Sequence, residues 1–423
     1  MRARYFYGWN VVAATFVMAL WSFGLGFYGL TVYVAAIQRL HGWSAAAVSA
    51  PVTVYYVVGA LLTASMGKLF ERFGPRVVVG IGCIAMALGL TALGRVVALW
   101  QLYPAFLSMA MGWGAMSGAA INVILAPWWE RRRGLAVSLA FNGATFGGVL
   151  IAPALVPLID ALGFPRALAV AALSLIAIPL PIAIGVMQRG PETLGFGPDG
   201  DARHSAPNTP GAGHPAPARK TSAAALRPSP RGDALRTWRF WSVSAPFALG
   251  LAAQVGVLTH LVPLLTPTLG TGRAAVAVSA ATGAALIGRL ATGVVVDRVN
   301  PRLVATITLV VQMTGLGLLA QAPTMAGAYA GCALFGLGVG NLTTLPGLIM
   351  AAEWPRERFA SLVSLVVGIN QLTFAFGPSL VGVVRDWSGA YTLALGAAAT
   401  LQSLAAILVL LGPVGSLARR RVQ

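Results

Sequence analysis

Residues 67–76 read Gly67-Lys-Leu-Phe-Glu71-Arg72-Phe-Gly-Pro-Arg76, and residues 293–302 read Gly293-Val-Val-Val-Asp297-Arg298-Val-Asn-Pro-Arg302. A glycine, an acidic residue and two arginines occupy the same offsets in both stretches, which begin 226 residues apart. A second set repeats at a period of 225: Trp129, Arg133 and Pro153 recur as Trp354, Arg358 and Pro378. The chain therefore contains two copies of one unit in the same order.

Apolar runs long enough to cross a bilayer recur along the chain. Of the 423 residues 57% are hydrophobic and 9% are charged, which leaves too few charges to cover a soluble globule. A bilayer core takes about 20 apolar residues, and we expect twelve spans at 9–37, 44–67, 77–95, 98–127, 135–158, 166–187, 240–266, 274–295, 303–322, 325–350, 359–384 and 389–413. The predicted fold class is an all-α membrane protein, with twelve transmembrane helices in two pseudo-symmetric six-helix bundles. Parallel repeats of this kind predict a transporter whose two halves rock around a central substrate site.

The basic residues follow a membrane topology rather than a nucleic-acid-binding face, although the net charge is +18. Of the 29 basic residues, 23 lie at the termini or in loops that follow even-numbered spans. The exceptions are Arg39, Arg95, Arg166, Arg273 and Arg385 in the opposite loops and Arg289 within a span. By the positive-inside rule, both termini are expected in the cytoplasm. The excess of arginine over lysine suggests a bacterial source, and therefore the inner membrane.

Residues 188–237 interrupt the hydrophobic pattern and are rich in Pro, Gly, Ala, Ser and Arg. Such a segment buries too little apolar surface to offset its chain entropy, so we expect a flexible cytoplasmic linker. The predicted domains are a six-helix bundle at 1–187, the linker at 188–237, and a second six-helix bundle at 238–423 with a short basic tail. No nucleophile–base pair or metal-ligand cluster is visible, so we expect neither an enzyme nor a cofactor or metal.

The duplicated loop resembles the signature loop of the major facilitator superfamily. Two further stretches narrow the resemblance: Tyr7-Gly-Trp9-Asn-Val-Val opens the first span, and Trp128-Trp-Glu-Arg-Arg-Arg-Gly-Leu-Ala-Val-Ser-Leu-Ala-Phe-Asn-Gly-Ala-Thr-Phe-Gly148 enters the fifth. Both look like motifs of monocarboxylate transporters and the related bacterial oxalate–formate antiporters. The resemblance covers nearly the whole chain except the linker and tail. It implies alternating access, with a substrate site near the bilayer midplane between the bundles.

The chain departs from this family pattern at three places. Phe27 stands where mammalian members carry a lysine, and Ala285 stands where they carry an Asp four residues before the span-eight arginine. Asn370 and Gln371 occupy span eleven, where the oxalate antiporter has a second intramembrane cation. A single buried cation argues against a dicarboxylate and favours a small organic monoanion. The missing Lys and Asp leave proton symport, anion exchange and facilitated diffusion open, and the family favours protons.

Arg289 is the residue that we expect to hold the substrate. An arginine in the middle of a span costs at least about 2.5–3.5 kcal/mol on insertion scales, so it must face water, a partner or a ligand. Its planar guanidinium suits a carboxylate bound through two hydrogen bonds. The resemblance also places a substrate-anchoring arginine here. The alternative is that Arg289 snorkels to the interface or bonds to helix carbonyls.

His260 is the one histidine within an expected span, and it is a candidate for hydrogen-bonding the substrate or carrying a proton. The other expected substrate-binding residues are polar or aromatic side chains within spans: Asn122, Asn142, Asn341, Asn370, Gln371, Phe27, Tyr28, Tyr55 and its neighbour Tyr56. The alternative for each is a packing or interhelical role. No carboxylate lies deep within an expected span. A coupled proton would therefore bind near His260 or to a substrate carboxylate beside Arg289.

Six residues of the duplicated loops form a predicted gate: Glu71, Arg72, Arg76, Asp297, Arg298 and Arg302. The resemblance implies that each loop clasps the facing bundle when the cytoplasmic side is closed. The alternative is that these residues only set topology and tight turns.

The sequence as a whole predicts a monomeric, proton-coupled monocarboxylate transporter surrounded by membrane lipid. Efflux of hydrophobic or aromatic compounds, and a substrate sensor that signals through the linker, are the alternatives.

Overall fold

The computed structural model describes residues 6–187, 190–194, 197–200, 234–296, 298–321, 324–354 and 356–412. Within these residues, twelve helical segments are long and apolar enough to cross a membrane. They are Gly8–His41, Ala45–Thr63, Pro75–Leu93, Leu99–Leu125, Arg133–Leu162, Phe164–Val186, Trp238–Thr259, Thr271–Val295, Pro301–Ala320, Met325–Met350, Leu362–Ser388 and Tyr391–Leu410. The predicted all-α membrane fold with twelve spans is confirmed.

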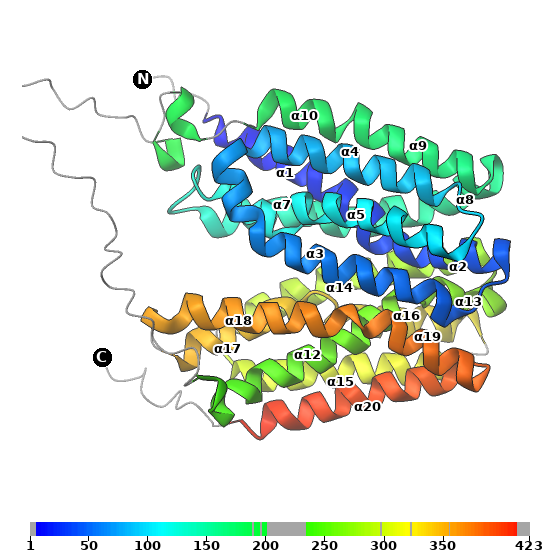
Figure 1. The fold of residues 1–423 in the computed structure, drawn as a ribbon. Coiled ribbons are helices and arrows are strands. Elements are labelled where there is room, and N and C mark those ends of the chain that lie inside the picture. The colour runs from blue at the N-terminus through cyan, green and yellow to red at the C-terminus, as the bar shows by residue number, and fades with distance from the viewer. Residues whose placement is uncertain are drawn as a thin grey trace, which may run out of the picture.

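The first six spans form one layer of the molecule and the last six form the other (Figure 1). The first layer contains α1 (Gly8–Phe23), η1 (Gly24–Tyr28), α2 (Gly29–His41), α3 (Ala45–Phe73), α4 (Pro75–Leu93), η2 (Leu99–Gln101), α5 (Leu102–Met116), α6 (Gly118–Leu125), α7 (Arg133–Phe146), η3 (Gly147–Ile151), α8 (Ala152–Leu162), α9 (Phe164–Ala177) and α10 (Pro179–Val186). We call this layer the first half. Two of its spans contain a π-helix, η1 in span one and η3 in span five.

The second half contains the remaining long helices: α12 (Trp238–Thr259), α13 (Leu261–Leu269), α14 (Thr271–Val295), α15 (Pro301–Ala320), α16 (Met325–Gly338), α17 (Asn341–Glu353), α18 (Arg356–Ala375), α19 (Gly377–Ser388) and α20 (Tyr391–Leu410). Most of the expected linker lies outside the described residues. Its described parts include two short turns, η4 (Pro191–Leu194) and η5 (Pro198–Gly200). The domain boundaries at 187 and 238 and the flexibility of the linker stay predictions.

The prolines that repeat at the 225-residue period mark equivalent places in the two halves. Pro153 lies in the first turn of α8, and Pro378 lies in the first turn of α19. A proline is tolerated there because the first N–H groups of a helix have no partner within it. Just before each proline the span is interrupted, by η3 in span five and by Phe376 in span eleven. The repeat therefore preserves a break in the helix as well as the loop at its end.

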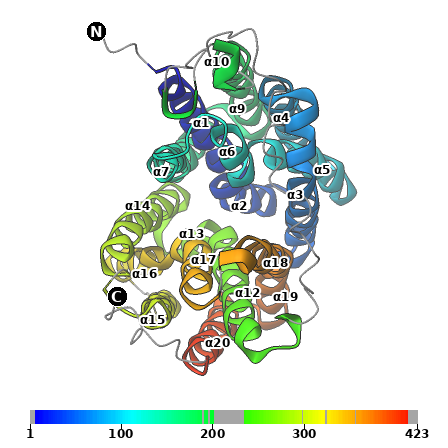
Figure 2. The same cartoon turned by 90° about the vertical axis from the view of Figure 1, so that its left-hand side faces the viewer.

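The two halves meet at one end of the molecule and diverge toward the other (Figure 1). Helix α1 begins and helix α20 ends on the diverging side, which we call the terminal end; the opposite side is the distal end. Figure 2 views the molecule from the terminal end, with α1–α10 above and α12–α20 below. Contacts between the halves join α3 to α18 and α19, α14 to η3 and α8, and α2 to α13.

Candidate functional site

Arg289 lies on α14, between the halves. Its Nε atom is buried and has no hydrogen-bond partner among the described residues, whose ion pairs do not include this arginine. The guanidinium lies against Gly340, at the break between α16 and α17. Gly340 has a φ of +93°, which favours glycine, and a Cβ atom there would collide with the guanidinium. The break in span ten therefore provides the space for the Arg289 side chain.

Tyr28, from η1 in the first half, approaches the same arginine. It is 7% exposed, lies within electrostatic range of Arg289, and approaches the side chain of Thr282 on α14. Gly148 of η3 lies beside both: a Cβ atom there would be 2.8 Å from the Tyr28 ring and 2.6 Å from the Thr282 methyl group. The two π-helices of the first half thus face α14 near Arg289, and π-helices are frequent at functional sites.

Two predicted amides present a buried oxygen without a partner among the described residues. Asn341 begins α17 directly after Gly340, and Asn370 lies on α18; they are 2% and 3% exposed. The Asn341 Nδ2 atom donates to Leu337 O at 3.1 Å, which leaves Oδ1 unpaired, and Asn370 Oδ1 is also unpaired. Buried polar atoms normally have a partner. Several tryptophan side chains lack one as well, so these oxygens support a binding site only together with Arg289.

The remaining predicted amides have less defined surroundings. Asn122 is partly buried on α6, and its Nδ2 donates to Gly118 O of the same helix at 2.9 Å. Asn142 on α7 and Gln371 on α18 are partly buried. The structure does not join these three side chains to Arg289, and their substrate role stays a prediction.

Aromatic rings form a continuous surface across the middle of the first half. Phe27 stacks on Trp113 of α5 with ring centroids 6.0 Å apart and packs edge-on against Tyr28 at 5.1 Å. Phe27 also contacts Tyr56 of α3 at 6.2 Å, and Tyr56 contacts Phe374 of α18 at 5.5 Å. Phe23 packs against Trp113 at 4.9 Å. These six residues, which we call the aromatic wall, extend from Tyr28 beside Arg289 across to the second half.

The sequence interpretation included Phe27, Tyr28, Tyr55 and Tyr56 but missed Phe23, Trp113 and Phe374. Tyr55 is fully buried, and its hydroxyl donates to Gly26 O of η1 at 2.6 Å, which is a packing contact. The sequence contained one signal for Trp113. Tryptophan usually lies at the membrane–water interface, whereas Trp113 lies near the middle of its span, which is an unusual position for it.

His260 lies apart from this group, at the break between α12 and α13 in the distal half of the molecule. It is 1% exposed, and its Nε2 atom is 2.9 Å from Ser49 Oγ and 3.1 Å from Pro378 O. Its Nδ1 atom is 3.1 Å from the Tyr391 hydroxyl. Both ring nitrogens therefore have an oxygen partner, and the contact with Ser49 crosses between the halves. The predicted role of His260 in substrate binding stays a prediction.

Other hydrogen bonds close the distal interface. Both Asp386 carboxylate oxygens accept from the first N–H groups of α3, at 3.0 Å from Ala45 N and 2.6 Å from Ala46 N. A carboxylate there is favoured by the helix dipole and by the free N–H groups of a helix start. In addition, Thr53 Oγ1 lies 2.7 Å from Ser379 Oγ, and Val262 N donates to Thr31 Oγ1 at 2.8 Å. We call these contacts and the His260–Ser49 pair the distal seal.

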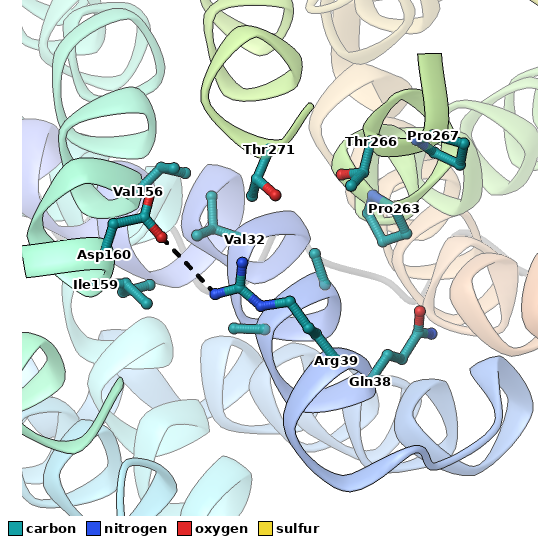
Figure 3. Close-up of a pocket in the computed structure, with 12 residues that line it drawn as sticks. Val32, Gln38, Arg39, Val156, Ile159, Asp160, Pro263, Thr266, Pro267 and Thr271 are labelled. Atoms are coloured by element: carbon teal, nitrogen blue, oxygen red, sulfur yellow. Dashed lines mark ion pairs between the residues drawn. The ribbon is translucent and has the colours of Figure 1, made fainter. Parts of the chain in front are cut away.

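A cavity of about 300 Å³ opens at the distal end between α2, α8, α13 and α14 (Figure 3). Arg39 and Asp160 face one another across it at 3.8 Å, with side chains 53% and 55% exposed. Thr271, at its edge, begins α14, and Arg289 lies roughly 27 Å farther along that helix at 1.5 Å per residue. This cavity is therefore separate from the Arg289 group.

The residues of the predicted gate have different surroundings in the two halves. Glu71, Arg72 and Arg76 are exposed at the end of α3 and the start of α4, and no ion pair of the described residues includes them. Arg298 is exposed and Asp297 lies outside the described residues. In this arrangement the first loop does not clasp the facing half through an ion pair among the described residues, and the gating role stays a prediction.

Arg302, by contrast, is buried and engaged within its own half. Its Nε and Nη2 atoms donate to Glu353 of α17 at 2.6 and 2.9 Å, and the side chains are 5% and 6% exposed. Its other donors reach Ser242 O, Ser242 Oγ and Val409 O. Arg302 thus joins α15 to α12, α17 and α20.

The described part of the chain contains no group of three or more His, Cys, Asp or Glu side chains placed to bind a metal.

Comparisons with known proteins agree with this architecture. The family model described as Major Facilitator Superfamily matches residues 16–378. Monocarboxylate transporter 11 of Homo sapiens is 30% identical over 415 residues, covering 91% of this chain and 79% of that protein. The mouse protein of the same name is 29% identical over 419 residues, covering 91% and 83%. The oxalate:formate antiporter of Oxalobacter formigenes is 32% identical over 148 residues, covering 35% and 34%.

Solved structures match over nearly the whole chain at low identity. The nucleoside transporter NupG superposes with a TM-score of 0.71 at 13% identity, covering 94% of this chain and 99% of that one. A bacterial homologue of the human lysosomal transporter Spinster, in an inward-facing and occupied conformation, gives 0.67 at 14% identity, covering 96% and 95%. At these identities the likeness supports the fold alone.

Proposed function

The chain belongs to the major facilitator superfamily, and from that premise we propose that it moves a small organic monoanion across the membrane by alternating access. It is an integral membrane protein of a transporter family rather than an enzyme, and its substrate is a small molecule. The observation that carries the proposal is Arg289, an intramembrane cation with a buried, unpaired Nε atom and no ion-pair partner among the described residues. An uncompensated charge at this depth calls for an anion.

The surroundings of Arg289 suit one carboxylate. A guanidinium binds a carboxylate through two parallel hydrogen bonds. The Tyr28 hydroxyl, which comes from the first half, is a further donor for this carboxylate. Asn341 Oδ1, directly after the break, is an acceptor and suits a hydroxyl or another donor group of the same substrate. The relative named monocarboxylate transporter 11 carries this substrate class in its name, which supports the same class here.

The arrangement of the halves corresponds to an inward-facing state if the termini are cytoplasmic in a bacterial inner membrane. The distribution of basic residues favours that topology. The hydrogen bonds of the distal seal would then close the outer side, while the helices diverge toward the cytoplasm. Opening the outer side would break the Asp386 contacts with α3. The cytoplasmic side would then close, and the loop that contains Glu71 and Arg72 would contact the facing half.

We further propose that transport is coupled to protons. His260 is a buried imidazole whose ring nitrogens both face oxygen atoms, and its Ser49 contact joins the halves. The charged groups near it are Arg385 and Asp386. A histidine in this position changes its hydrogen bonding when it gains a proton, and the seal provides the two-state element that it would bias. The protein would act as a monomer in lipid.

Efflux of a hydrophobic or aromatic compound is the second candidate. The aromatic wall is the observation that favours it, since these rings offer a large apolar surface next to a single cation. The two candidates differ in whether the substrate needs a carboxylate.

Uptake by purified protein in liposomes tests both. Arg289→Lys is expected to reduce carboxylate uptake to background, because lysine keeps the charge but loses the paired hydrogen bonds. The matched control is Arg273→Lys, an exposed arginine in the first turn of the same helix. An imposed inward proton gradient is expected to drive accumulation. If Arg289→Lys transports like the wild type, or only neutral and cationic compounds are carried, the monoanion proposal is wrong.

A further inference from the structure

We infer that the preferred substrate is an aryl-substituted monocarboxylate, in which a short linker joins one carboxylate to an aromatic ring. This inference rests on the proposed function and adds the chemistry of the part of the substrate that Arg289 does not bind. It is carried by the aromatic wall, which begins beside the arginine at Tyr28 and continues through Phe27 to Trp113 and Phe374.

The rings of the wall are available to a ligand. Phe23, Phe27, Trp113 and Phe374 are each partly exposed, unlike the fully buried Tyr55 behind them. The Tyr56–Phe374 contact crosses from α3 to α18, and the Tyr28–Thr282 contact crosses from η1 to α14. Phe27 contacts Tyr28 and Tyr56, one residue of each crossing, which places it at the interface between the halves.

The geometry of the ring pairs leaves faces and edges for another ring. Phe27 meets Tyr28 at 88° and Tyr56 at 70°, and it lies nearly parallel to Trp113 at 16°. Aromatic pairs prefer such edge-to-face and offset stacked arrangements, with centroids roughly 4.5–7 Å apart. A substrate ring inserted beside Phe27 would extend the same pattern.

The polar groups limit the substrate to one charge. The second half offers the Arg289 guanidinium together with the unpaired oxygens of Asn341 and Asn370. Asn370 precedes Phe374 by four residues on α18, so the two side chains lie on the same face of that helix. A second carboxylate would meet the rings of the wall or the oxygens of the amides, and neither compensates a negative charge. A substrate without a ring, such as acetate, would reach the arginine but leave the wall unused.

The test compares three acids in equilibrium binding to the purified full chain: phenylacetate, cyclohexylacetate and acetate. Wild-type protein is expected to bind phenylacetate about tenfold or more tightly than acetate, because the ring buries apolar surface. It is expected to bind phenylacetate roughly two- to tenfold more tightly than cyclohexylacetate, because only the former gains ring–ring contacts.

Two substitutions in the wall, each with a matched control, locate the preference. Trp113→Leu and Phe27→Leu are expected to bring the phenylacetate-to-cyclohexylacetate ratio close to one, mainly by weakening phenylacetate binding. The controls are Trp100→Leu, a 68% exposed tryptophan at the distal end, and Phe146→Leu, a 44% exposed phenylalanine outside the wall. Acetate binding by each variant shows that its Arg289 site is folded.

The outcomes separate this inference from the proposed function. If all three acids bind equally and Arg289→Lys abolishes their binding, the monoanion proposal stands and the aryl preference is wrong. If the wall variants keep the wild-type ratio, the preference arises elsewhere and the inference is also wrong. If no acid binds, or Arg289→Lys binds all three normally, both are wrong.

Discussion

The two halves share one order of helices but contribute different chemistry to the surface between them. The second half supplies the cation: Arg289 lies on α14, and the 226-residue offset of the duplicated loop places Thr63 at the corresponding position of α3. The first half supplies the rings: Trp113 lies on α5, and the 225-residue offset places Gly338 at its counterpart in α16. Duplication thus preserved the scaffold, while the second half presents the cation to the interface and the first half presents five of the six rings of the aromatic wall.

The same divergence occurs at the terminal end. In the second half, the buried Arg302–Glu353 pair ties the start of α15 to the end of α17. In the first half, the equivalent Arg76 is exposed, and the nearby Trp128 loop is held instead by Asp199. The Arg302–Glu353 pair of the second half and the Asp199 contacts of the first half can therefore be compared by mutation.

The largest effect is expected at the buried ion pair. Arg302→Gln should lower the free energy of unfolding by about 3–5 kcal/mol, because it leaves the Glu353 carboxylate buried without its charge partner. Arg76→Gln, at the equivalent place in the first half, should change it by less than about 0.5 kcal/mol, since Arg76 is exposed. Denaturant unfolding in detergent micelles measures both, and Glu353→Gln serves as the reciprocal variant. Equal effects for Arg302 and Arg76 would contradict the divergence.

A smaller effect is expected from narrowing the space around the cation. Gly340→Ala should displace the Arg289 guanidinium and weaken one charged hydrogen bond to a carboxylate, worth about 1.5–3 kcal/mol, or about ten- to 100-fold in affinity. Gly347→Ala on α17 is the control, because a Cβ atom there meets nothing within 4 Å. Binding titrations with a monocarboxylate measure the change. Wild-type affinity in Gly340→Ala would show that the break in span ten does not position the arginine.

The smallest effect is expected at the Asp199 contact of the first half. Its Oδ2 accepts from Arg131 N at 2.8 Å and Glu130 N at 3.2 Å, and Oδ1 accepts from Arg132 N at 3.3 Å. Asp199→Asn should destabilise the protein by about 1 kcal/mol at neutral pH, the net value of a typical hydrogen bond. Asp160→Asn, in an exposed pair at the distal end, should cost less. Thermal unfolding of the two variants at pH 7 distinguishes them.

The Asp199 contact should also depend on pH. Desolvation acts to raise the pKa of this carboxyl, but hydrogen bonds from the backbone of Arg131, Arg132 and Glu130, and the charge of Arg131, hold the pKa below its usual range. A lowered pKa means that the contact stabilises the folded state above the ordinary carboxyl pKa of about 3.9 and is lost as the pH falls through the folded value. The stability difference between wild type and Asp199→Asn should therefore be constant near neutral pH and shrink in acid. A difference that grows in acid would contradict the contact.

Local features of the chain were enough to predict the twelve spans and the central arginine. Span length follows from bilayer thickness, and an arginine within a span is costly wherever it lies, so both can be read without knowing the packing. The spacing of Trp129 and Trp354 and of Pro153 and Pro378 likewise predicted the repeat, and the structure shows that the prolines mark equivalent helix breaks.

Other parts of the site depend on contacts between distant residues. Trp113 stands in an apolar run like many packed residues, and only its stacking on Phe27 places it in the wall. Asp386 follows the end of the expected span at 359–384 and is therefore expected in a loop, although α19 extends to Ser388. In the folded chain it binds the start of α3, about 340 residues away. No local pattern of the sequence contains such a pairing.

The sequence by itself determined which segments cross the membrane, that they form two related units, and that one span carries a cation, because hydrophobicity, repetition and charge are properties of residues in order. Only the tertiary structure decided what that cation faces. The positive φ of Gly340, the approach of Tyr28 from the other half and the unpaired oxygens of Asn341 and Asn370 arise when helices far apart in the chain pack together. Burial and hydrogen bonding are set by those neighbours, so the same residue types have different surroundings elsewhere in the chain.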